Sequence, residues 1–385
     1  MTIQEMLERE DIYTILSETL EEYFSMVWGR NVSVKVEKSL FKNRYVIYPR
    51  LGIVSARFPS WKVAKDIYNQ FNVQGNLKRK LFAWGYITLC FLTGGLMASR
   101  TLYVSEKEWC KRDRYILPCN RKIRIFDYGK GYVDAILKVG FSDTYFKNEL
   151  KYRAKPEYSF IPPFLEYGDR WYREAILTGR ALVRISEPAY TEAVEKTKKE
   201  IRLLYNDTLH HESITSYCQR LVDSIQKKLP ILVNKKGMSV EYVNNVLDKC
   251  KKYVNGFDTP VPLVTSHGDL QTGNIMVGEN GKVTIYDWET AGERSIWFDM
   301  GKLLLYSQRK GGYAHMIDNR ENYEVSSRLL SLDNKKYPMT GIIAVLVLEE
   351  MAFFVDEIVD LPGTMGTEIM DRLTDELKNT VLFRV

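Results

Sequence analysis

The chain has 385 residues and a mass of 44.9 kDa. One ordinary core holds about 100 to 200 residues, so we expect two or three packed units. Its residues are 45% hydrophobic, 12% aromatic and 27% charged, which excludes a mostly disordered or fibrous protein. Five scattered cysteines without a C-x-x-C pair indicate neither a disulfide framework nor a thiolate zinc site. Because the acidic segment 1–22 lacks the basic and then apolar start of an export signal, we expect a cytoplasmic protein.

The net charge of +6 is unevenly distributed along the chain. Residues 23–119 contain 17 Lys and Arg against 5 Asp and Glu, so the basic surplus belongs to the first third. Such a surplus suits an anionic substrate, phospholipid head groups or nucleic acid, and it is equally compatible with a solvated surface. No motif for reading nucleic acid accompanies it, so nucleic acid is the least expected partner.

Residues 81–99 form a run of 19 residues without a formal charge, bracketed by Lys78, Arg79, Lys80 and Arg100. As a helix the run would extend about 28 Å, close to the hydrocarbon thickness of a bilayer. Its glycines, threonines and serine dilute the hydrophobicity, and basic residues at both ends give no orientation. We favour a buried helix, with an interfacial helix held by its basic flanks and a true membrane span as alternatives.

The first 114 residues mix helical and strand patterns. Apolar side chains follow helical spacing over 12–23, alternate as in strands over 32–36 and 44–47, and return to helical spacing over 61–71. We therefore expect a small mixed α/β domain over residues 1–114, whose role the sequence leaves open.

Strand patterns with tight turns dominate the next part of the chain, and helical patterns dominate the part after it. An antiparallel hairpin is expected first, followed by a helix and two further strands. The expected strands cover 122–127, 132–139, 160–167 and 171–177, the hairpin turn lies at 129–131, the helix begins near 142–143, and the helical body covers 188–257.

The most informative stretch is 264–275, VTSHGDLQTGNI, followed by KVTIYDWE at 282–289. It places Asn274 five positions after Asp269, and Asp287 at the end of a short apolar strand. Phosphoryl transfer needs such a set, because one carboxylate must meet the acceptor hydroxyl and hard oxygen ligands must hold the magnesium of the nucleotide. Asp269 would then be the catalytic base, and Asn274 and Asp287 the metal ligands. The alternative is an ordinary hairpin with polar corners.

A second pair of residues supports phosphate chemistry. Lys138 ends the second hairpin strand in AILK, and Glu149 lies 11 positions later on the predicted helix. In kinases a strand lysine holds the α and β phosphates, and a helix glutamate fixes that lysine. A lone lysine or glutamate is usually a surface residue, but the order of this pair and the 264–275 loop favours the functional interpretation.

The runs HGDLQTGNIMV and IYDWE resemble the catalytic and metal-binding segments of the aminoglycoside phosphotransferase and choline kinase superfamily, relatives of the protein kinases. The resemblance covers about residues 115–385 and leaves 1–114 unexplained. It implies a bilobal, protein-kinase-like α+β fold, with an antiparallel-sheet N-lobe over 115–182 and a mainly helical C-lobe over 183–385. It also implies that Lys138 pairs with Glu149, and that ATP and magnesium are the cofactors.

Further roles follow from the resemblance alone. Glu174, Ala175, Ile176 and Leu177, in REAILTGRAL, would lie at the hinge whose backbone meets adenine. Asp299, in WFDMGKLL, resembles the family aspartate that braces the catalytic loop.

The chain departs from the protein-kinase pattern at one point. No G-x-G-x-x-G precedes the lysine strand, and the candidate phosphate loop is Pro-Cys-Asn-Arg at 118–121, where Arg121 or backbone amides would meet phosphate.

Three histidines call for separate interpretations. We interpret His267 as a packing and hydrogen-bonding residue rather than a proton carrier. The adjacent His210 and His211 lack the i, i+4 spacing of a helical metal site, so no metal is proposed there.

The sequence therefore predicts an ATP- and magnesium-dependent phosphotransferase that moves the γ-phosphate to a hydroxyl of a small molecule. Acidic residues in the expected acceptor region are interleaved with basic ones, so no acidic wall for a polycationic aminoglycoside is expected. The basic first third favours an anionic or membrane-linked acceptor, such as a sugar or a glycan or lipid precursor, and peripheral contact with the inner face of an anionic membrane. The alternative is a catalytically inactive, kinase-like scaffold recruited through its basic N-terminal domain.

Overall fold

A computed structural model describes most of the chain, which folds into two compact units. The sheet unit comprises Met1–Lys147 and Pro162–Arg180, and the helical unit comprises Asn148–Ile161 and Ala181–Val385. The described residues are 3–38, 45–70, 77–95, 97–106, 109–154, 156–234, 240–255, 259–308, 320–332 and 337–361.

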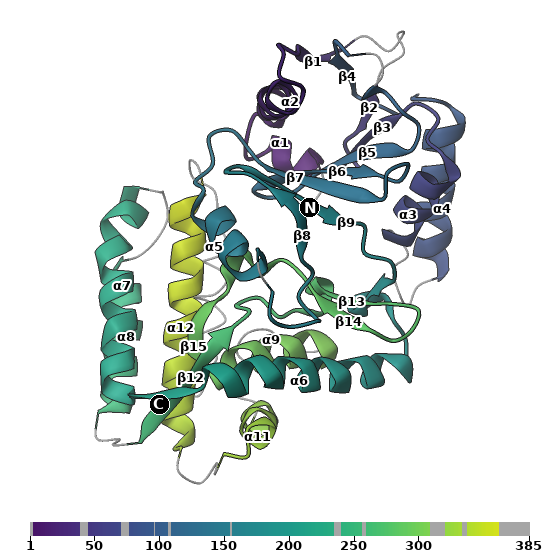
Figure 1. Ribbon diagram of the computed structural model, residues 1–385. Helices are drawn as coiled ribbons and strands as arrows, with labels where there is room; N and C mark the ends of the chain where they lie inside the picture. The colour runs from purple at the N-terminus through teal and green to yellow at the C-terminus, as the bar shows by residue number, and fades with distance from the viewer. Residues whose placement is uncertain are drawn as a thin grey trace. The chain divides into compact units, whose positions relative to one another are not determined.

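The described residues of the sheet unit contain a nine-stranded antiparallel sheet in the order β1-β4-β2-β3-β5-β6-β7-β9-β8 (Figure 1). The strands are β1 (Val34–Glu37), β2 (Tyr45–Tyr48), β3 (Ile53–Ala56), β4 (Arg100–Val104), β5 (Arg114–Pro118), β6 (Lys122–Asp127), β7 (Tyr132–Leu137), β8 (Phe164–Tyr167) and β9 (Trp171–Ala175). The predicted hairpin is present as β6 and β7, which pair from Lys122 with Leu137 to Asp127 with Tyr132.

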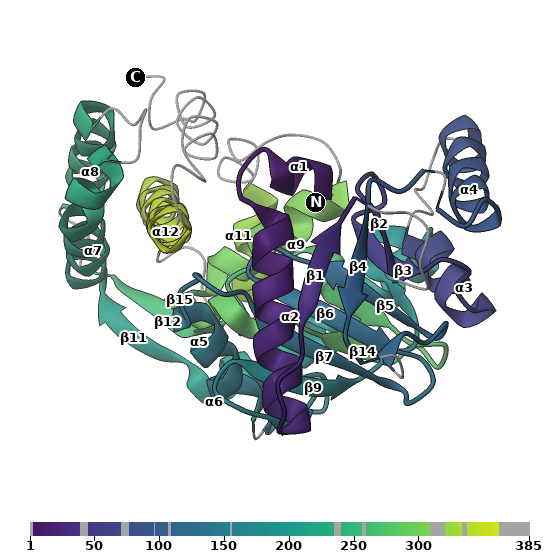
Figure 2. The ribbon, with the colours of Figure 1, turned by 90° about the horizontal axis from the view of Figure 1, so that it is seen from above.

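Both faces of this sheet are covered by helices. Successive side chains of a strand point to opposite faces, so neighbouring residues of one strand pack with different helices. Tyr45 and Ile47 pack with α1 (Ile3–Leu7) and α2 (Ile12–Trp28), whereas Val46 and Tyr48 pack with α3 (Trp61–Gln70) and α4 (Leu77–Leu92). Figure 2 shows α2 lying along the sheet. The central strands are therefore apolar on both sides, and all four residues of β2 are buried.

The N-terminal residues extend the sheet of the expected N-lobe. Val54 of β3 pairs with Ile116 of β5, so the boundary expected at residue 114 falls inside one continuous sheet and one compact unit. The physical reason is that β5 has an open edge, and a strand from the first 114 residues satisfies its backbone hydrogen bonds.

The helix α4 differs from the buried helix that the uncharged run predicts. Ile87 and Cys90 are buried, but Phe82 is 78% exposed, Leu92 76% and Leu81 57%. The helix packs through one side on α3, where Tyr68 contacts Trp84 edge to face, and on β2, where the hydroxyl of Tyr48 donates to the carbonyl of Cys90 at 3.1 Å. Among the described helices, none combines the length and the apolar character needed to cross a bilayer.

The described part of the helical unit contains six α-helices, a short part of a seventh and two small three-stranded sheets, β11-β12-β15 and β10-β13-β14. Its helices are the C-terminal part of α5 (Thr144–Arg153), α6 (Ala189–Thr208), α7 (Ile214–Asn234), α8 (Val240–Val254), α9 (Ile296–Gln308), α11 (Arg320–Leu329) and α12 (Met339–Asp360). Its strands are β10 (Arg180–Ala181, where Arg180 belongs to the sheet unit), β11 (His210–Ser213), β12 (Pro260–Ser266), β13 (Ile275–Val277), β14 (Val283–Ile285) and β15 (Gly292–Ser295). The predicted α+β fold is therefore confirmed.

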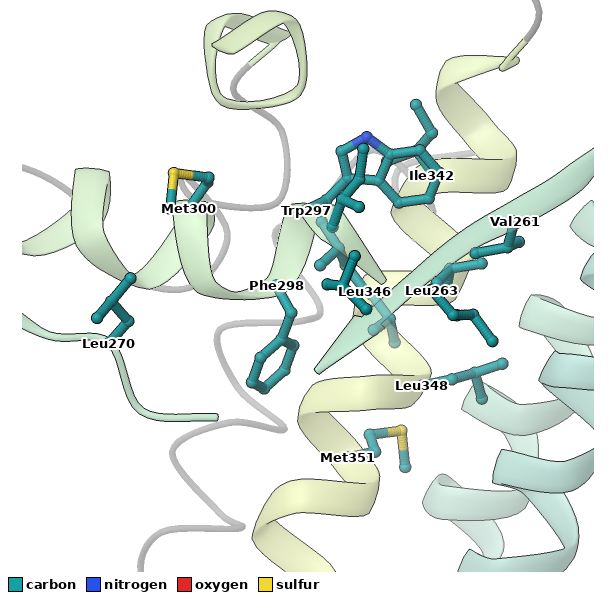
Figure 3. Packing of buried hydrophobic residues seen from close by; sticks show 14 of the residues in the cluster. Val261, Leu263, Leu270, Trp297, Phe298, Met300, Ile342, Leu346, Leu348 and Met351 are labelled. Carbon is teal, nitrogen blue, oxygen red and sulfur yellow. The ribbon is translucent and has the colours of Figure 1, made fainter. Parts of the chain in front are cut away.

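The core of the helical unit lies between β12, α9 and α12. Figure 3 shows Leu263 of β12 close to Leu346 of α12, with Phe298 of α9 packing nearby. Almost every residue on the first four turns of α12 is buried, which the sequence IIAVLVL makes possible without exposing apolar surface. This core holds both ends of the segment 260–299, which carries the candidate catalytic residues.

Candidate active site

The segment 260–299 runs from β12 through a loop and a hairpin to α9, all within the helical unit. After β12 ends at Ser266, the loop His267-Gly268-Asp269 leads into a short 3₁₀ turn that ends at Asn274. Strands β13 and β14 then pair as a hairpin, with Ile275 opposite Ile285. Because Tyr286 donates its N–H to the carbonyl of Asn274 (3.1 Å), the chain returns to the loop just before Asp287.

Asp299 holds the backbone of the candidate catalytic loop. Its carboxylate, fully buried at the start of α9, accepts the N–H groups of His267 (2.7 Å) and Gly268 (2.9 Å). The hydroxyl of Tyr205 donates to the same carboxylate at 3.0 Å. Hydrogen bonds between backbone N–H groups and a buried carboxylate are strong and fix the direction of the chain. The bracing role that the resemblance implies for Asp299 is confirmed.

His267 is buried in one tautomer. Its Nε2 lies 3.0 Å from the carbonyl of Tyr286 and its Nδ1 lies 3.3 Å from the N–H of Asp269. A carbonyl can only accept and an N–H can only donate, so this geometry matches the tautomer with its proton on Nε2 and an accepting Nδ1. The rings of His267 and Trp288 also meet edge to face, with their centroids 4.7 Å apart. His267 therefore packs and orients the loop, as predicted.

Gly268 is the residue that this loop geometry requires. Its φ is +84°, and a Cβ placed there would lie 2.2 Å from the carbonyl oxygen of Thr290. The glycine therefore allows the loop to pass close to the turn that follows Asp287.

Asp269 and Asn274 are in direct contact. The amide Nδ2 of Asn274 donates to Oδ2 of Asp269 at 3.0 Å and to its carbonyl at 2.9 Å. Gln271 donates its Nε2 to the same Oδ2 at 2.8 Å. These bonds orient the Asp269 carboxylate and direct the amide nitrogen of Asn274 toward Asp269, so Oδ1 is the atom of Asn274 that would bind a metal ion.

A group of three acidic side chains can hold a metal ion. One carboxylate oxygen each from Glu149, Asp287 and Glu289 lies within 4.8 Å of the others. Asp287 adopts the left-handed conformation (φ +68°, ψ +56°), which is uncommon for a residue with a side chain and concentrates at functional sites. Carboxylate and amide oxygens are the ligands that magnesium prefers, so the donor set fits the implied metal.

Glu149 is fully buried and forms an ion pair with Arg153 at 2.8 Å, one turn further along α5. The sequence predicts Lys138 as its partner instead. Lys138 follows β7, its side chain is fully buried, and its ammonium donates to Oε1 of Glu10 at 2.6 Å. Each member of the predicted pair therefore bonds a residue of its own unit, and the pairing of Lys138 with Glu149, which would join the two units, stays a prediction.

The expected hinge residues begin at the end of β9. Glu174 and Ala175 still pair with β7, at Val133 and Tyr132, and Ile176 donates its N–H to the carbonyl of Gly131 at 3.1 Å. The segment is therefore well held on the side of the sheet unit. Its predicted contact with adenine, including that of Leu177, stays a prediction.

Residues 170–324 match the sequence model of a phosphotransferase enzyme family. The matched range includes the catalytic loop, the β13-β14 hairpin and Asp299, so the family resemblance read from HGDLQTGNIMV and IYDWE is confirmed, as is the predicted enzyme class, a phosphotransferase. No curated protein matches the chain.

Among solved structures, a choline/ethanolamine kinase family protein from Mesorhizobium loti is 15% identical, with 70% of this chain and 89% of that one covered and a TM-score of 0.48. A Plasmodium vivax ethanolamine kinase is 14% identical over 84% and 95% of the two chains, with a TM-score of 0.46. An aminoglycoside phosphotransferase from Streptomyces rimosus, in complex with ADP and streptomycin, is 16% identical over 60% and 92%, with a TM-score of 0.39.

Four residues of the site were missed by the sequence reasoning. Glu10, Arg153, Gln271 and Glu289 each bond or adjoin a predicted residue. Two of them could have been found from the sequence, because Gln271 lies inside the motif HGDLQTGN and Glu289 inside the motif IYDWE. Arg153 stands one helical turn after Glu149, a spacing that favours ion pairs. Nothing in the sequence connects Glu10 with Lys138.

Proposed function

We propose that this phosphotransferase uses ATP and magnesium to phosphorylate a hydroxyl group of a small molecule. The observation that carries the proposal is the Asp269 carboxylate, held by Asn274 and Gln271 on a loop that Asp299 braces. A base that must meet an acceptor hydroxyl in one orientation needs such fixed positioning, because phosphoryl transfer depends mainly on alignment and charge neutralisation.

Asp269 has two tasks in this reaction. Its Oδ2 receives the bonds from Asn274 and Gln271, which leaves Oδ1 to face the acceptor hydroxyl. As the acceptor oxygen bonds to the γ-phosphorus, the bond from that phosphorus to the bridging β,γ-oxygen breaks and ADP leaves. The hydroxyl proton passes to Asp269 late in this step.

Asn274 and Asp287 would hold the magnesium, and the carboxylates of Glu149 and Glu289 lie close to that of Asp287. When bound, the ion neutralises charge on the β- and γ-phosphates. Lys138 would contact the α- and β-phosphates, and Glu174 to Leu177 would meet adenine through their backbone.

We infer the charge of the acceptor from the charged residues of the region expected to bind it. Helix α6, within the expected acceptor region 183–257, carries four acidic and four basic residues, so the local charges are mixed. A neutral or anionic acceptor, such as a sugar or a glycan or lipid precursor, fits this balance better than a polycation.

The test uses the purified chain with labelled ATP and a panel of sugars, aminoglycosides and lipid head-group alcohols. Asp269→Ala is expected to lower kcat by about 10² to 10⁴-fold and to leave nucleotide binding in place, because the carboxylate acts on the acceptor. Asp248→Ala, which removes an exposed carboxylate on α8, is the matched control and should keep full activity.

Two results would contradict the proposal. One is turnover of Asp269→Ala at the wild-type rate on the true acceptor. The other is a wild-type chain that transfers phosphate to no acceptor and gains no thermal stability from ATP with magnesium, which would favour the inactive scaffold instead.

We also propose that the exposed side of α4 contacts the inner face of an anionic membrane. Leu81, Phe82, Leu89 and Leu92 are exposed on one side of this helix, and Trp61 at the start of α3 is 74% exposed. Large apolar side chains seldom gather on a free surface unless they meet a partner or a membrane. Their arrangement is that of a helix lying in a membrane interface.

The basic side chains near these apolar residues favour a lipid surface over another partner. Among the described side chains, α3 carries Lys62 and Lys65 and α4 carries Lys78 and Lys80, against one acidic residue on the two helices, Asp66. The Asp66 carboxylate is already bonded to Tyr115 at 2.6 Å. A basic rim around an apolar helix face complements the negative potential of a phospholipid surface.

Vesicle sedimentation tests this contact with phosphatidylcholine vesicles that contain or lack phosphatidylglycerol. We expect binding only to the anionic vesicles, and a loss of at least about tenfold in Phe82→Ser/Leu92→Ser, because each buried apolar side chain contributes about 1.5 to 3 kcal/mol. Leu203→Ser, at an exposed leucine on α6, should bind as wild type does. Equal binding by all three proteins, or none by the wild type, would refute the contact.

A further inference from the structure

The carboxylate bonded to Lys138 comes from the start of the chain. Glu10 precedes Lys138 by 128 positions, yet its Oε1 lies 2.6 Å from the lysine Nζ. The Lys138 side chain is 0% exposed and that of Glu10 is 5% exposed. Both charges are therefore withdrawn from water and held against each other, which distinguishes this pair from the exposed ion pairs of the molecular surface.

The segment that carries Glu10 is held in place on both sides. Before Glu10, Ile3 and Met6 are buried in the core of the sheet unit. After it, Asp11 caps α2 by accepting the N–H of Thr14 at 3.3 Å, and Ile12 is fully buried. Glu10 thus stands at a fixed point between two anchored segments.

Helix α2 also binds the residue next to Lys138. The hydroxyl oxygen of Thr19, almost fully buried, accepts the backbone N–H of Val139 at 3.0 Å. Within the candidate phosphate loop, Asn120 accepts a hydrogen bond from Arg9 at 3.3 Å. The N-terminal segment therefore contacts the lysine, its neighbour in the chain and the phosphate loop.

The pKa of Lys138 depends on its bond with Glu10. Burial lowers the pKa of Lys138, and the Glu10 carboxylate is the strongest influence that raises it again. The ring of Phe141, 5.2 Å from the ammonium, adds an attraction to its π face. Without Glu10 the lysine would be a buried cation without its paired carboxylate.

We propose that Glu10 is the positioning residue of Lys138, so that the N-terminal segment is a working part of the nucleotide site. The proposal rests on the phosphate-binding role of Lys138 in the proposed function. Glu10 keeps the ammonium charged and aimed, and Lys138 then meets the nucleotide phosphates in that orientation. The strands and helices of residues 1–114 consequently serve to deliver one carboxylate as well as to extend the sheet.

The test compares Glu10→Gln with Glu8→Gln in the full-length chain. Both variants remove one negative charge from the same segment, but Glu8 is exposed. We expect Glu10→Gln to raise the KM for ATP at least about tenfold while the KM for the acceptor stays within about twofold, because Lys138 acts on the nucleotide. Glu8→Gln should match the wild type, and Glu10→Asp should recover part of the loss.

A second measurement does not require activity. Amine-selective acetylation of Lys138, followed by mass spectrometry over a pH series, reports the pKa and the accessibility of the lysine. Glu10→Gln is expected to shift the labelling curve of Lys138 to lower pH, whereas Glu8→Gln leaves it in place. This labelling also identifies a Glu10→Gln chain that has unfolded, because every lysine would then react.

The outcomes separate this proposal from the proposed function. If the wild type transfers phosphate and both Glu10→Gln readouts equal those of Glu8→Gln, the positioning role is wrong and the enzyme assignment stands. A rise in kcat/KM for Glu10→Gln would also overturn the role, because the carboxylate would then compete with phosphate for the lysine. If the wild type transfers no phosphate, an unshifted labelling curve refutes the pair and a shifted curve supports it, with the enzyme assignment alone rejected.

Discussion

The candidate catalytic segment 260–299 and the surroundings of Lys138 each hold a candidate functional side chain in one orientation, but they do so in different ways. In the segment, Asp299 reaches the loop over only 32 positions, and its carboxylate bonds backbone N–H groups. At Lys138 the bond joins two side chains 128 positions apart. The first arrangement depends on a short contiguous motif, and the second depends on the whole sheet unit being folded.

This difference has a structural consequence. Loss of a carboxylate in the segment leaves backbone donors unsatisfied and changes the path of the loop. Loss of Glu10 leaves the backbone intact and changes the charge and aim of one lysine. We therefore expect substitutions in the segment to affect stability and activity together, and substitution of Glu10 to affect mainly the interaction with nucleotide.

The largest effect expected in the segment is that of Asp299→Ala. This change removes the acceptor of three buried donors, the N–H groups of His267 and Gly268 and the hydroxyl of Tyr205. The N–H of Gly268 keeps the hydroxyl oxygen of Ser266 as an acceptor at 3.0 Å, so two of the three donors lose their acceptor. Each unsatisfied donor costs about 1 to 3 kcal/mol, so we expect a loss of at least about 2 kcal/mol in the free energy of unfolding, measured by denaturant titration, and near-complete loss of activity.

Tyr205→Phe is the control for Asp299→Ala, because it removes one of the three donors and leaves the carboxylate bonded to the loop. It should cost about 1 kcal/mol and keep most of the activity. Equal stability of Asp299→Ala and Tyr205→Phe would mean that the backbone bonds do not shape the loop, and the contrast between the two regions would fail.

The same contrast explains which parts of the molecule could be predicted from the sequence. Asp269, Asn274 and Asp287 lie within 19 positions, and the β13-β14 hairpin between them has a register that keeps Asn274 beside Tyr286. The β6-β7 hairpin is equally local, with its glycines at the turn. Such features need only neighbouring residues, so residue pattern and spacing are sufficient to predict them.

The features that could not be predicted depend on distant residues. The pairing of Val54 with Ile116 joins strands from two predicted domains, and an antiparallel edge accepts any strand of suitable apolar pattern. The run 81–99 is apolar on all sides, so its pattern does not distinguish a buried helix from the exposed α4. Glu10 has no periodic relation to Lys138, and a carboxylate 128 positions away carries no signal in the sequence.

The smallest expected effect is that of Glu349, which bonds the segment from 54 positions away. Glu349 on α12 is fully buried and accepts the N–H of Ser295 (2.5 Å), the hydroxyl of Ser295 (2.7 Å) and the hydroxyl of Tyr217 (2.5 Å). Burial raises the pKa of Glu349 from 4.5 to about 7 despite these bonds. Near its end the segment therefore contacts a distant carboxyl group, that of Glu349, whose pKa lies near neutral pH.

The sign of the pH dependence follows from this raised pKa. Between pH 4.5 and about 7 the folded chain holds a proton on Glu349 that the unfolded chain has lost, so stability falls as the pH rises through this window and levels off above it. The slope is at most about 1.4 kcal/mol per pH unit. Glu349→Gln cannot titrate, and thermal unfolding over the pH series should show this slope reduced relative to wild type, while Glu279→Gln, at an exposed position in the β13-β14 turn, keeps it. If Glu349→Gln retains the wild-type slope, Glu349 does not titrate in this window, and the pH dependence of stability has another source.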